Sequence, residues 1–157
     1  MTPLVVVVGY GNPYLSDDGL GWHVAGKLKH LEENYRPEML RILQLIQLGP
    51  ELAELLSQSD LVLFVDAEEG LNPGAISRTV VQPSQLTSAH SHQLSPQHLF
   101  YLCQELYGEV PQGWLHTAGG SKWDHGSEMS EEMHRAYIQL VAVVSDEIKD
   151  FFGVGSA

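Results

Sequence analysis

The sequence predicts an α/β protein of three layers, in which helices cover both faces of a mixed sheet of β-strands. Residues 4–8 (LVVVV) and 61–67 (LVLFVDA) are continuous apolar runs, which are typical of strands buried on both faces. Helical and strand patterns alternate along most of the chain. The strand predicted at 61–67 is followed by another at 75–82 with only a turn between them. This arrangement predicts a hairpin and therefore a sheet that is not purely parallel.

The predicted elements follow the order βαβαββαβα. Strands are expected at residues 4–8, 38–48, 61–67, 75–82 and 113–120. Helices are expected at about residues 17–32, 49–59, 95–108 and 130–152. Apolar and polar residues alternate in the fourth strand, which is typical of a strand nearer the edge of a sheet. The strands at 4–8 and 61–67 are expected to be central.

Capping residues mark where the helices begin. Ser16 offers an N-cap for the first helix and places Asp17 and Asp18 in its first turn, where acidic side chains stabilise the helix dipole. Ser95, followed by proline, marks the start of the third helix, and a glycine marks its end. Ser130 fits the capped start of the last helix.

The composition excludes several classes of function. A length of 157 residues suits one domain, and we expect residues 1–157 to form it. The formal net charge of −12 disfavours nucleic acids and anionic membranes as partners. Cys103 has no second cysteine to pair with and lies in an apolar helical pattern, which predicts a buried thiol. Without a basic leader or an apolar run of about 18 residues, the sequence predicts a cytoplasmic protein.

The loop after the first strand, in VVVVGYGNPYLSDDGLGWHV (5–24), resembles the start of a dinucleotide site but lacks its chemistry. The fingerprint of such sites needs a third glycine where this sequence has Tyr14. Asp17 and Asp18 stand where a pyrophosphate would sit, and their charges would repel it. The glycines Gly9 and Gly11 are therefore expected to let the backbone turn, and not to cradle a phosphate.

The same loop favours a cation site. Asp18 follows the first strand and Asp66 ends the third, so both are expected at the carboxyl end of the sheet, where α/β proteins bind ligands. An imidazole could come from His90, His92 or His98, which the spacing alone does not separate. Two carboxylates and one imidazole suit nickel or zinc. Either adjacent aspartate could instead be a helix-start acid, and each histidine a solvated loop residue.

The motif GYGNPYLSDDGLG resembles the signature of the hydrogenase maturation endopeptidases, G-x-G-N-x-x-x-x-D-[DE]-G-x-G. The segments LVLFVDAEEG, SHQLSPQHLFYLCQELYG and LHTAGGSKWDHGSEMS agree in the same order, so the resemblance covers essentially the whole chain. It implies a mixed, mostly parallel five-stranded sheet flanked by helices. It also implies an endopeptidase that removes the C-terminal extension of a NiFe-hydrogenase large-subunit precursor after nickel insertion.

Site residues carry over from the family by position. The resemblance implies Asp18, Asp66 and His92 as metal-contacting residues, and the SHQLSP segment selects His92 over His90. The family often has glutamate where Asp18 stands. Gly9, Gly11 and Asn12 would shape the backbone of the substrate loop. Many members have an acid after the second strand where this chain has Gln44 and Gln47, which leaves the hydrogenase subclass undetermined.

The resemblance also suggests a mechanism. Nickel would be held by the thiolates of the precursor, and Asp18, Asp66 and His92 would complete its coordination and dock the substrate tail. A polarised carbonyl or a water activated by an aspartate would then react, with Asp17 as a candidate second carboxylate for that water. Two alternatives remain open from the sequence: a nickel-binding maturation chaperone that cuts nothing, and an α/β enzyme acting on small molecules.

Overall fold

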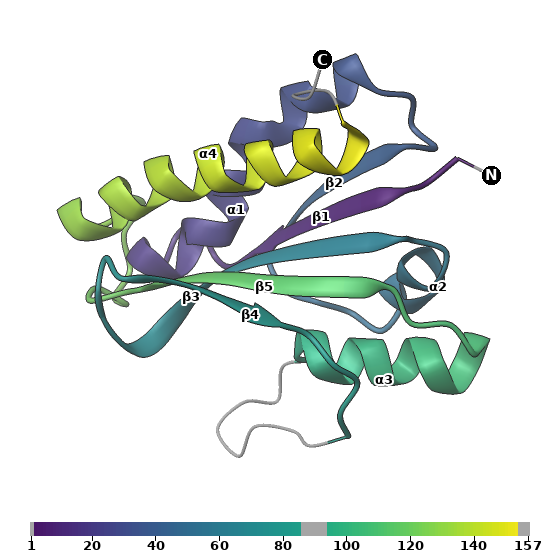
Figure 1. Ribbon diagram of the computed structural model, residues 1–157. Coiled ribbons are helices and arrows are strands. Elements are labelled where there is room, and N and C mark those ends of the chain that lie inside the picture. The colour runs from purple at the N-terminus through teal and green to yellow at the C-terminus, as the bar shows by residue number, and fades with distance from the viewer. Residues whose placement is uncertain (1, 86–93, 154–157) are drawn as a thin grey trace.

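The computed structural model describes residues 2–85 and 94–153 and contains one five-stranded sheet within them (Figure 1). The strands are β1 (Val5–Tyr10), β2 (Leu40–Leu45), β3 (Leu61–Pro73), β4 (Ile76–Val80) and β5 (Gln112–Gly119). Their order in the sheet is β2-β1-β3-β5-β4, with β4 antiparallel to β5 and the other neighbours parallel. The predicted mixed, mostly parallel sheet is confirmed.

Helices cover both faces of this sheet, which confirms the predicted α/β class. The α-helices are α1 (Leu20–Leu28), α2 (Leu52–Ser57), α3 (Pro96–Tyr107) and α4 (Glu131–Phe152). Figure 1 shows α1 and α4 on one face of the sheet and α2 and α3 on the other. Each pair is also in mutual contact. Two short 3-10 helices, η1 (Ser16–Gly19) and η2 (Lys29–Asn34), precede and follow α1.

Strand β1 explains why the sequence begins with an unbroken apolar run. Val5 and Val7 lie in the hydrophobic core beneath α1 and α4, whereas Val6 and Val8 lie in the core beneath α2 and α3. All four side chains are fully buried. Since successive residues of a strand face opposite sides, only a central strand covered on both faces requires this pattern.

The predicted hairpin between the third and fourth strands is wrong. Strand β5 lies between β3 and β4 and pairs with both. Strand β3 continues beyond its predicted end to Pro73. The connection to β4 then passes the end of β5, where Gly74 N–H donates to the carbonyl oxygen of Gly119. Strand β4 therefore arrives on the far side of β5, at the edge of the sheet, as its alternating pattern predicts.

The start of the first helix also differs from the prediction. Ser16 does not cap a helix: it opens η1 with a φ of 54°, and its hydroxyl donates to the carbonyl of Asp124. Helix α1 begins only at Leu20. The N-caps predicted for the later helices are confirmed, because Ser95 Oγ accepts from His98 N–H and Ser130 Oγ accepts from Met133 N–H.

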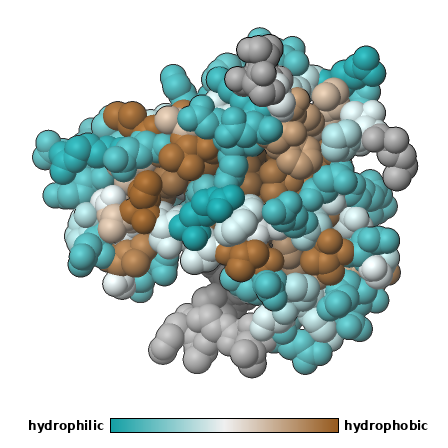
Figure 2. Space-filling view, in the orientation of Figure 1, coloured by the Kyte–Doolittle hydropathy of each residue, from teal (hydrophilic) through white to brown (hydrophobic). Residues whose placement is uncertain are grey.

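The surface is mixed in character. Figure 2 shows hydrophobic residues interspersed with hydrophilic ones on the face that it presents. No helix within residues 2–85 and 94–153 is both long and apolar enough to cross a membrane. Cys103 is fully buried, as predicted, and burial raises the pKa of its thiol to about 11, so it is an inert core residue.

Candidate active site

Asp66 lies in the body of β3 and not at its end, beside the tip of β1. Its Oδ1 accepts a hydrogen bond of 2.8 Å from Ala67 N–H. Burial, and next to it the negative charge of Asp18, raise the pKa of Asp66 to about 8. Hydrogen bonds from Ala67 N–H and from the Tyr10 hydroxyl oppose this rise only in part. The carboxyl group is thus poised to bind a cation or to exchange a proton near neutral pH.

Asp18 belongs to η1, which contacts β3. Its Oδ2 accepts a hydrogen bond of 2.8 Å from Asn12 N–H, which orients the carboxylate. The charge of Asp18 contributes to the raised pKa of Asp66, so the two acids lie close enough to interact. The structure therefore places Asp18 within electrostatic reach of Asp66, near the carboxyl end of β1, and their contact with a metal stays a prediction.

The histidines are only partly described. His90 and His92 lie outside the described residues, so the predicted ligand His92 stays a prediction. His98 lies in the first turn of α3 and contacts the ring of Tyr101 edge-on. Its Nδ1 is buried without a hydrogen-bond partner among residues 2–85 and 94–153. Within the same residues no cluster of three or more His, Cys, Asp or Glu could hold a metal ion.

Asp17 has surroundings that do not suit the role predicted for it. The side chain is fully buried. Its Oδ2 accepts from Ser121 N–H at 2.8 Å, Lys122 N–H at 3.0 Å and the Ser130 hydroxyl at 2.9 Å. Its Oδ1 accepts from Ser130 N–H at 2.7 Å. With both oxygens engaged and no exposure to solvent, the carboxylate anchors residues 121–130 to η1 and is not placed to activate a water.

The substrate loop takes its shape from Gly11. This residue has a φ of 145°, and a Cβ on it would lie 2.0 Å from the carbonyl oxygen of Asp18. Only glycine allows the turn that brings Asn12 N–H to the Asp18 carboxylate. The side-chain oxygen of Asn12 accepts in turn from Tyr14 N–H at 2.9 Å. The loop thus presents Asp18 by backbone geometry.

Gly9 has a different task from the turn that the sequence suggested. It lies within β1, where a Cβ would come within 2.1 Å of the carbonyl oxygen of Gly21 in α1. Its lack of a side chain lets α1 pack directly on the strand. The close approach that a dinucleotide fold obtains from its third glycine is obtained here from Gly9 and Gly21 together.

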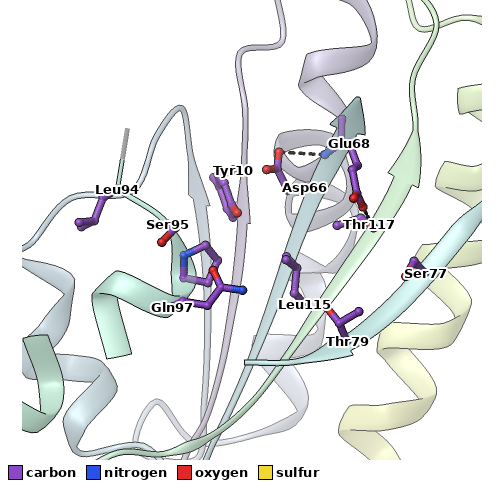
Figure 3. Close-up of a pocket in the computed structure, with 12 residues that line it drawn as sticks. Tyr10, Asp66, Glu68, Ser77, Thr79, Leu94, Ser95, Gln97, Leu115 and Thr117 are labelled. Carbon is purple, nitrogen blue, oxygen red and sulfur yellow. Dashed lines mark hydrogen bonds between the residues drawn. The ribbon is translucent and has the colours of Figure 1, made fainter. Parts of the chain in front are cut away.

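Tyr10 is a site residue that the sequence analysis missed. It lies beside Asp66, and burial, followed by the charge of Asp66, raises the pKa of Tyr10 well above 10.0. Figure 3 shows Tyr10, the last residue of β1, beside Asp66, which lies within β3. Tyr10 is the middle residue of the Gly-x-Gly motif. Phosphate-loop motifs allow any residue at this position, so its identity carried no functional meaning in the sequence.

The comparisons with solved structures identify the same fold. The maturation protease HycI of NiFe hydrogenase from Thermococcus kodakarensis matches with a TM-score of 0.75 and 25% identity, over 93% of this chain and 92% of that one. The maturating endopeptidase HybD from E. coli matches with a TM-score of 0.69 and 19% identity, over 92% and 93% of the two chains. HybD from Thermococcus kodakarensis matches with a TM-score of 0.67 and 18% identity, over 93% and 99%.

Neither the models of known protein families nor the curated protein sequences contain a match to this chain. The structural likeness nevertheless extends over nearly the full length of both partners in each comparison. It agrees with the sequence motif of the first loop, whose Asp18 lies close enough to Asp66 of β3 for its charge to raise the pKa of Asp66. This chain therefore has the fold of solved hydrogenase maturation proteases, and the motif of its first loop resembles the signature of those endopeptidases.

Proposed function

We propose that this protein is an endopeptidase that removes the C-terminal extension of a NiFe-hydrogenase large-subunit precursor once nickel has been inserted. The likeness to solved maturation proteases supports a hydrolase that acts on peptide bonds. The observation that carries the proposal is the interacting pair of Asp18 and Asp66 at the carboxyl end of the sheet. We place the reaction in the cytoplasm, as the sequence predicts.

The two carboxylates suit a divalent cation. Asp66 is held in a partly buried position next to the charge of Asp18, and this repulsion contributes to the raised pKa of Asp66. A cation between the two acids would relieve the repulsion and favour the ionised form of both. We propose that this cation is the nickel of the precursor and that His92 supplies a third contact. Nickel is thus part of the substrate and not a resident cofactor.

The residues around Asp66 are arranged to control a proton. Ala67 N–H donates to Oδ1 of Asp66 and orients its carboxyl group, and Tyr10 lines the same side of the site. The pKa of about 8 belongs to the metal-free protein, and a bound cation would lower it. The ionised Asp66 carboxylate would then accept a proton from an attacking water and return it to the amine that leaves when the C–N bond breaks. A nickel ion nearby would act as a Lewis acid. Asp18 is oriented by Asn12 N–H to contact the cation.

The test is cleavage of the precursor by the purified protein. We expect nickel-loaded large-subunit precursor to lose the mass of its C-terminal extension when incubated with this protein, as measured by mass spectrometry of the intact chain. The variants Asp18→Asn, Asp66→Asn and His92→Ala should each lower the rate at least tenfold, and His90→Ala should not. If the precursor keeps its full mass while nickel moves to this protein, the chaperone alternative is correct and the proposal is wrong.

A further inference from the structure

A cavity of about 430 Å³ opens beside Asp66 on the face of the sheet that α2 and α3 cover (Figure 3). Its floor is formed by neighbouring residues of the last two strands in the sheet. In the register of β4 with β5, Ser77 lies opposite Thr117 and Thr79 lies opposite Leu115. Since alternate residues share a face, these four side chains make one continuous patch.

The walls of the cavity connect this patch to the catalytic carboxylate. Tyr10 and Asp66 line one side, and the first residues of α3 line the other. Gln97 of α3 points across the opening in Figure 3. The cavity is therefore continuous with the site of bond cleavage, and a peptide bound at Asp66 would place a neighbouring side chain within it.

The lining of the cavity is rich in hydrogen-bond acceptors. Glu68 is fixed at the rim because its Oε2 accepts a hydrogen bond of 2.6 Å from the Thr117 hydroxyl. The second oxygen of Glu68 and the hydroxyls of Ser77 and Thr79 add further acceptors. The described residues that line the cavity include two acids and no lysine, arginine or histidine. An anionic side chain would be repelled by the two acids, and an apolar one would make no hydrogen bond to these groups.

We propose that this cavity is a side-chain subsite for the peptide that is cut, and that Glu68, held by Thr117, selects a side chain that bears N–H donors. The inference rests on the proposed protease function and adds a specificity-determining residue to it. Binding of one side chain in the cavity would fix the backbone of the precursor tail against Asp66 and so choose the bond that is cut. An N–H donor would bond to the Glu68 oxygen that Thr117 leaves free.

The first test fills the cavity. Thr79→Phe places a ring in the cavity, whereas Val80→Phe adds the same ring to the next residue of β4, whose side chain is half exposed on the opposite face. We expect Thr79→Phe to lower kcat/KM for nickel-loaded precursor at least tenfold and Val80→Phe to change it less than twofold. Thermal unfolding of the two variants should give Tm values within a few degrees of each other.

The second test changes only the acceptor. The substrates are precursors with single methionine substitutions, one at each position within three residues of the scissile bond. The rate of cleavage of each precursor is measured with the wild-type protein and with Glu68→Gln. Glu69→Gln, the adjacent exposed acid on the other face of the strand, is the matched control. At one position we expect the wild type and Glu69→Gln to prefer an N–H donor over methionine at least tenfold. Glu68→Gln should lose most of that preference.

The outcomes separate this inference from the proposed function. If the wild-type protein cuts no precursor, the proposed function fails. If the wild-type protein cuts but Thr79→Phe behaves as Val80→Phe does, or Glu68→Gln keeps the full preference, the subsite is wrong and the protease function stands. If Thr79→Phe does not fold, the Glu68→Gln comparison decides alone.

Discussion

Asp17 and Asp18 are neighbours in the chain, yet the fold gives them opposite tasks. Asp17 is fully buried and accepts four hydrogen bonds from the 121–130 segment and its helix cap. Asp18 is partly exposed, accepts from Asn12 N–H and contributes by its charge to the raised pKa of Asp66. Because consecutive residues of the short helix point in different directions, one acid can stabilise the loop while the other contacts a ligand.

This division predicts different effects for the two substitutions. Asp17→Ala leaves the donors of Ser121, Lys122 and Ser130 without their acceptor, so we expect the free energy of unfolding to fall by about 2–4 kcal/mol. Asp18→Asn should change it by about 1 kcal/mol or less while abolishing precursor cleavage. Urea denaturation measures both values. An Asp17→Ala protein of wild-type stability would contradict the anchoring role.

Asp66 predicts how the stability of the metal-free protein depends on pH. Its pKa is about 8 in the folded protein against an ordinary value of 3.8, so the folded state binds its proton more tightly than the unfolded state does. The free energy of unfolding should therefore decrease as pH rises from about 4 to about 8. Asp66→Asn removes this loss and should be more stable than the wild type by ~2–4 kcal/mol at pH 8, with the difference vanishing near pH 4.

The measurement is thermal or urea unfolding of both proteins in the presence of a chelator, at intervals from pH 4 to pH 8.5. Since asparagine can still accept from Ala67 N–H, the comparison isolates the charge. If the wild type is as stable as Asp66→Asn at pH 8, ionisation of Asp66 does not lower the free energy of unfolding and the prediction is wrong.

At the scale of elements, the site depends on the close contact of β1 with α1. Gly9→Ala would bring a methyl group within 2.1 Å of the Gly21 carbonyl oxygen and 2.6 Å of Ala25 Cβ, so the helix must move. We expect a loss of about 3 kcal/mol in the free energy of unfolding and slower cleavage, because α1 directly follows the η1 helix that holds Asp18.

Gly26→Ala provides the control within the same helix. A Cβ there would meet only the end of the Gln44 side chain, at 2.4 Å, and that side chain can move away. Alanine also favours the helix over glycine by about 1 kcal/mol. We therefore expect Gly26→Ala to be close to neutral by the same denaturation assay. Equal losses in the two variants would mean that the strand–helix contact is not the cause.

The elements also show where sequence patterns stop being sufficient. The apolar runs of β1 and β3 and the caps of α3 and α4 are local signals, and the structure agrees with them. The neighbours of β4 are set by distant residues: Arg78 pairs with Glu147 of α4 and lies over the ring of Trp114 in β5. No pattern near residue 78 reports these contacts, so the hairpin with β3 was the wrong prediction.

At the scale of the whole molecule, the site is assembled from segments far apart in sequence. The convergence of Asp18 and Asp66 could be predicted because parallel strands deliver their carboxyl ends to one edge of the sheet. The choice of His92 rests on the family resemblance alone, because His92 lies outside the described part of the chain. The role of Tyr10 beside Asp66 and the 430 Å³ cavity could not be predicted from the sequence, because the residues that form each of them come from different strands.

We propose that the protein recognises nickel held by its substrate. Two carboxylates and one imidazole, without a thiolate, make a weak permanent site, which suits a protein that must contact a metal on another chain and then leave. Without nickel, docking would lack its central contact, and the precursor should remain uncut. The need for metal should therefore follow the substrate and not the protease.

The most direct measurement is a single-turnover comparison of one precursor with and without nickel, using protease that has been treated with a chelator. We predict rapid cleavage of the nickel-loaded precursor and a rate at least a hundredfold lower for the nickel-free form, with no recovery when zinc is added to the protease alone. Equal cleavage of the two forms, or a strict need for zinc bound to the protease beforehand, would contradict the claim.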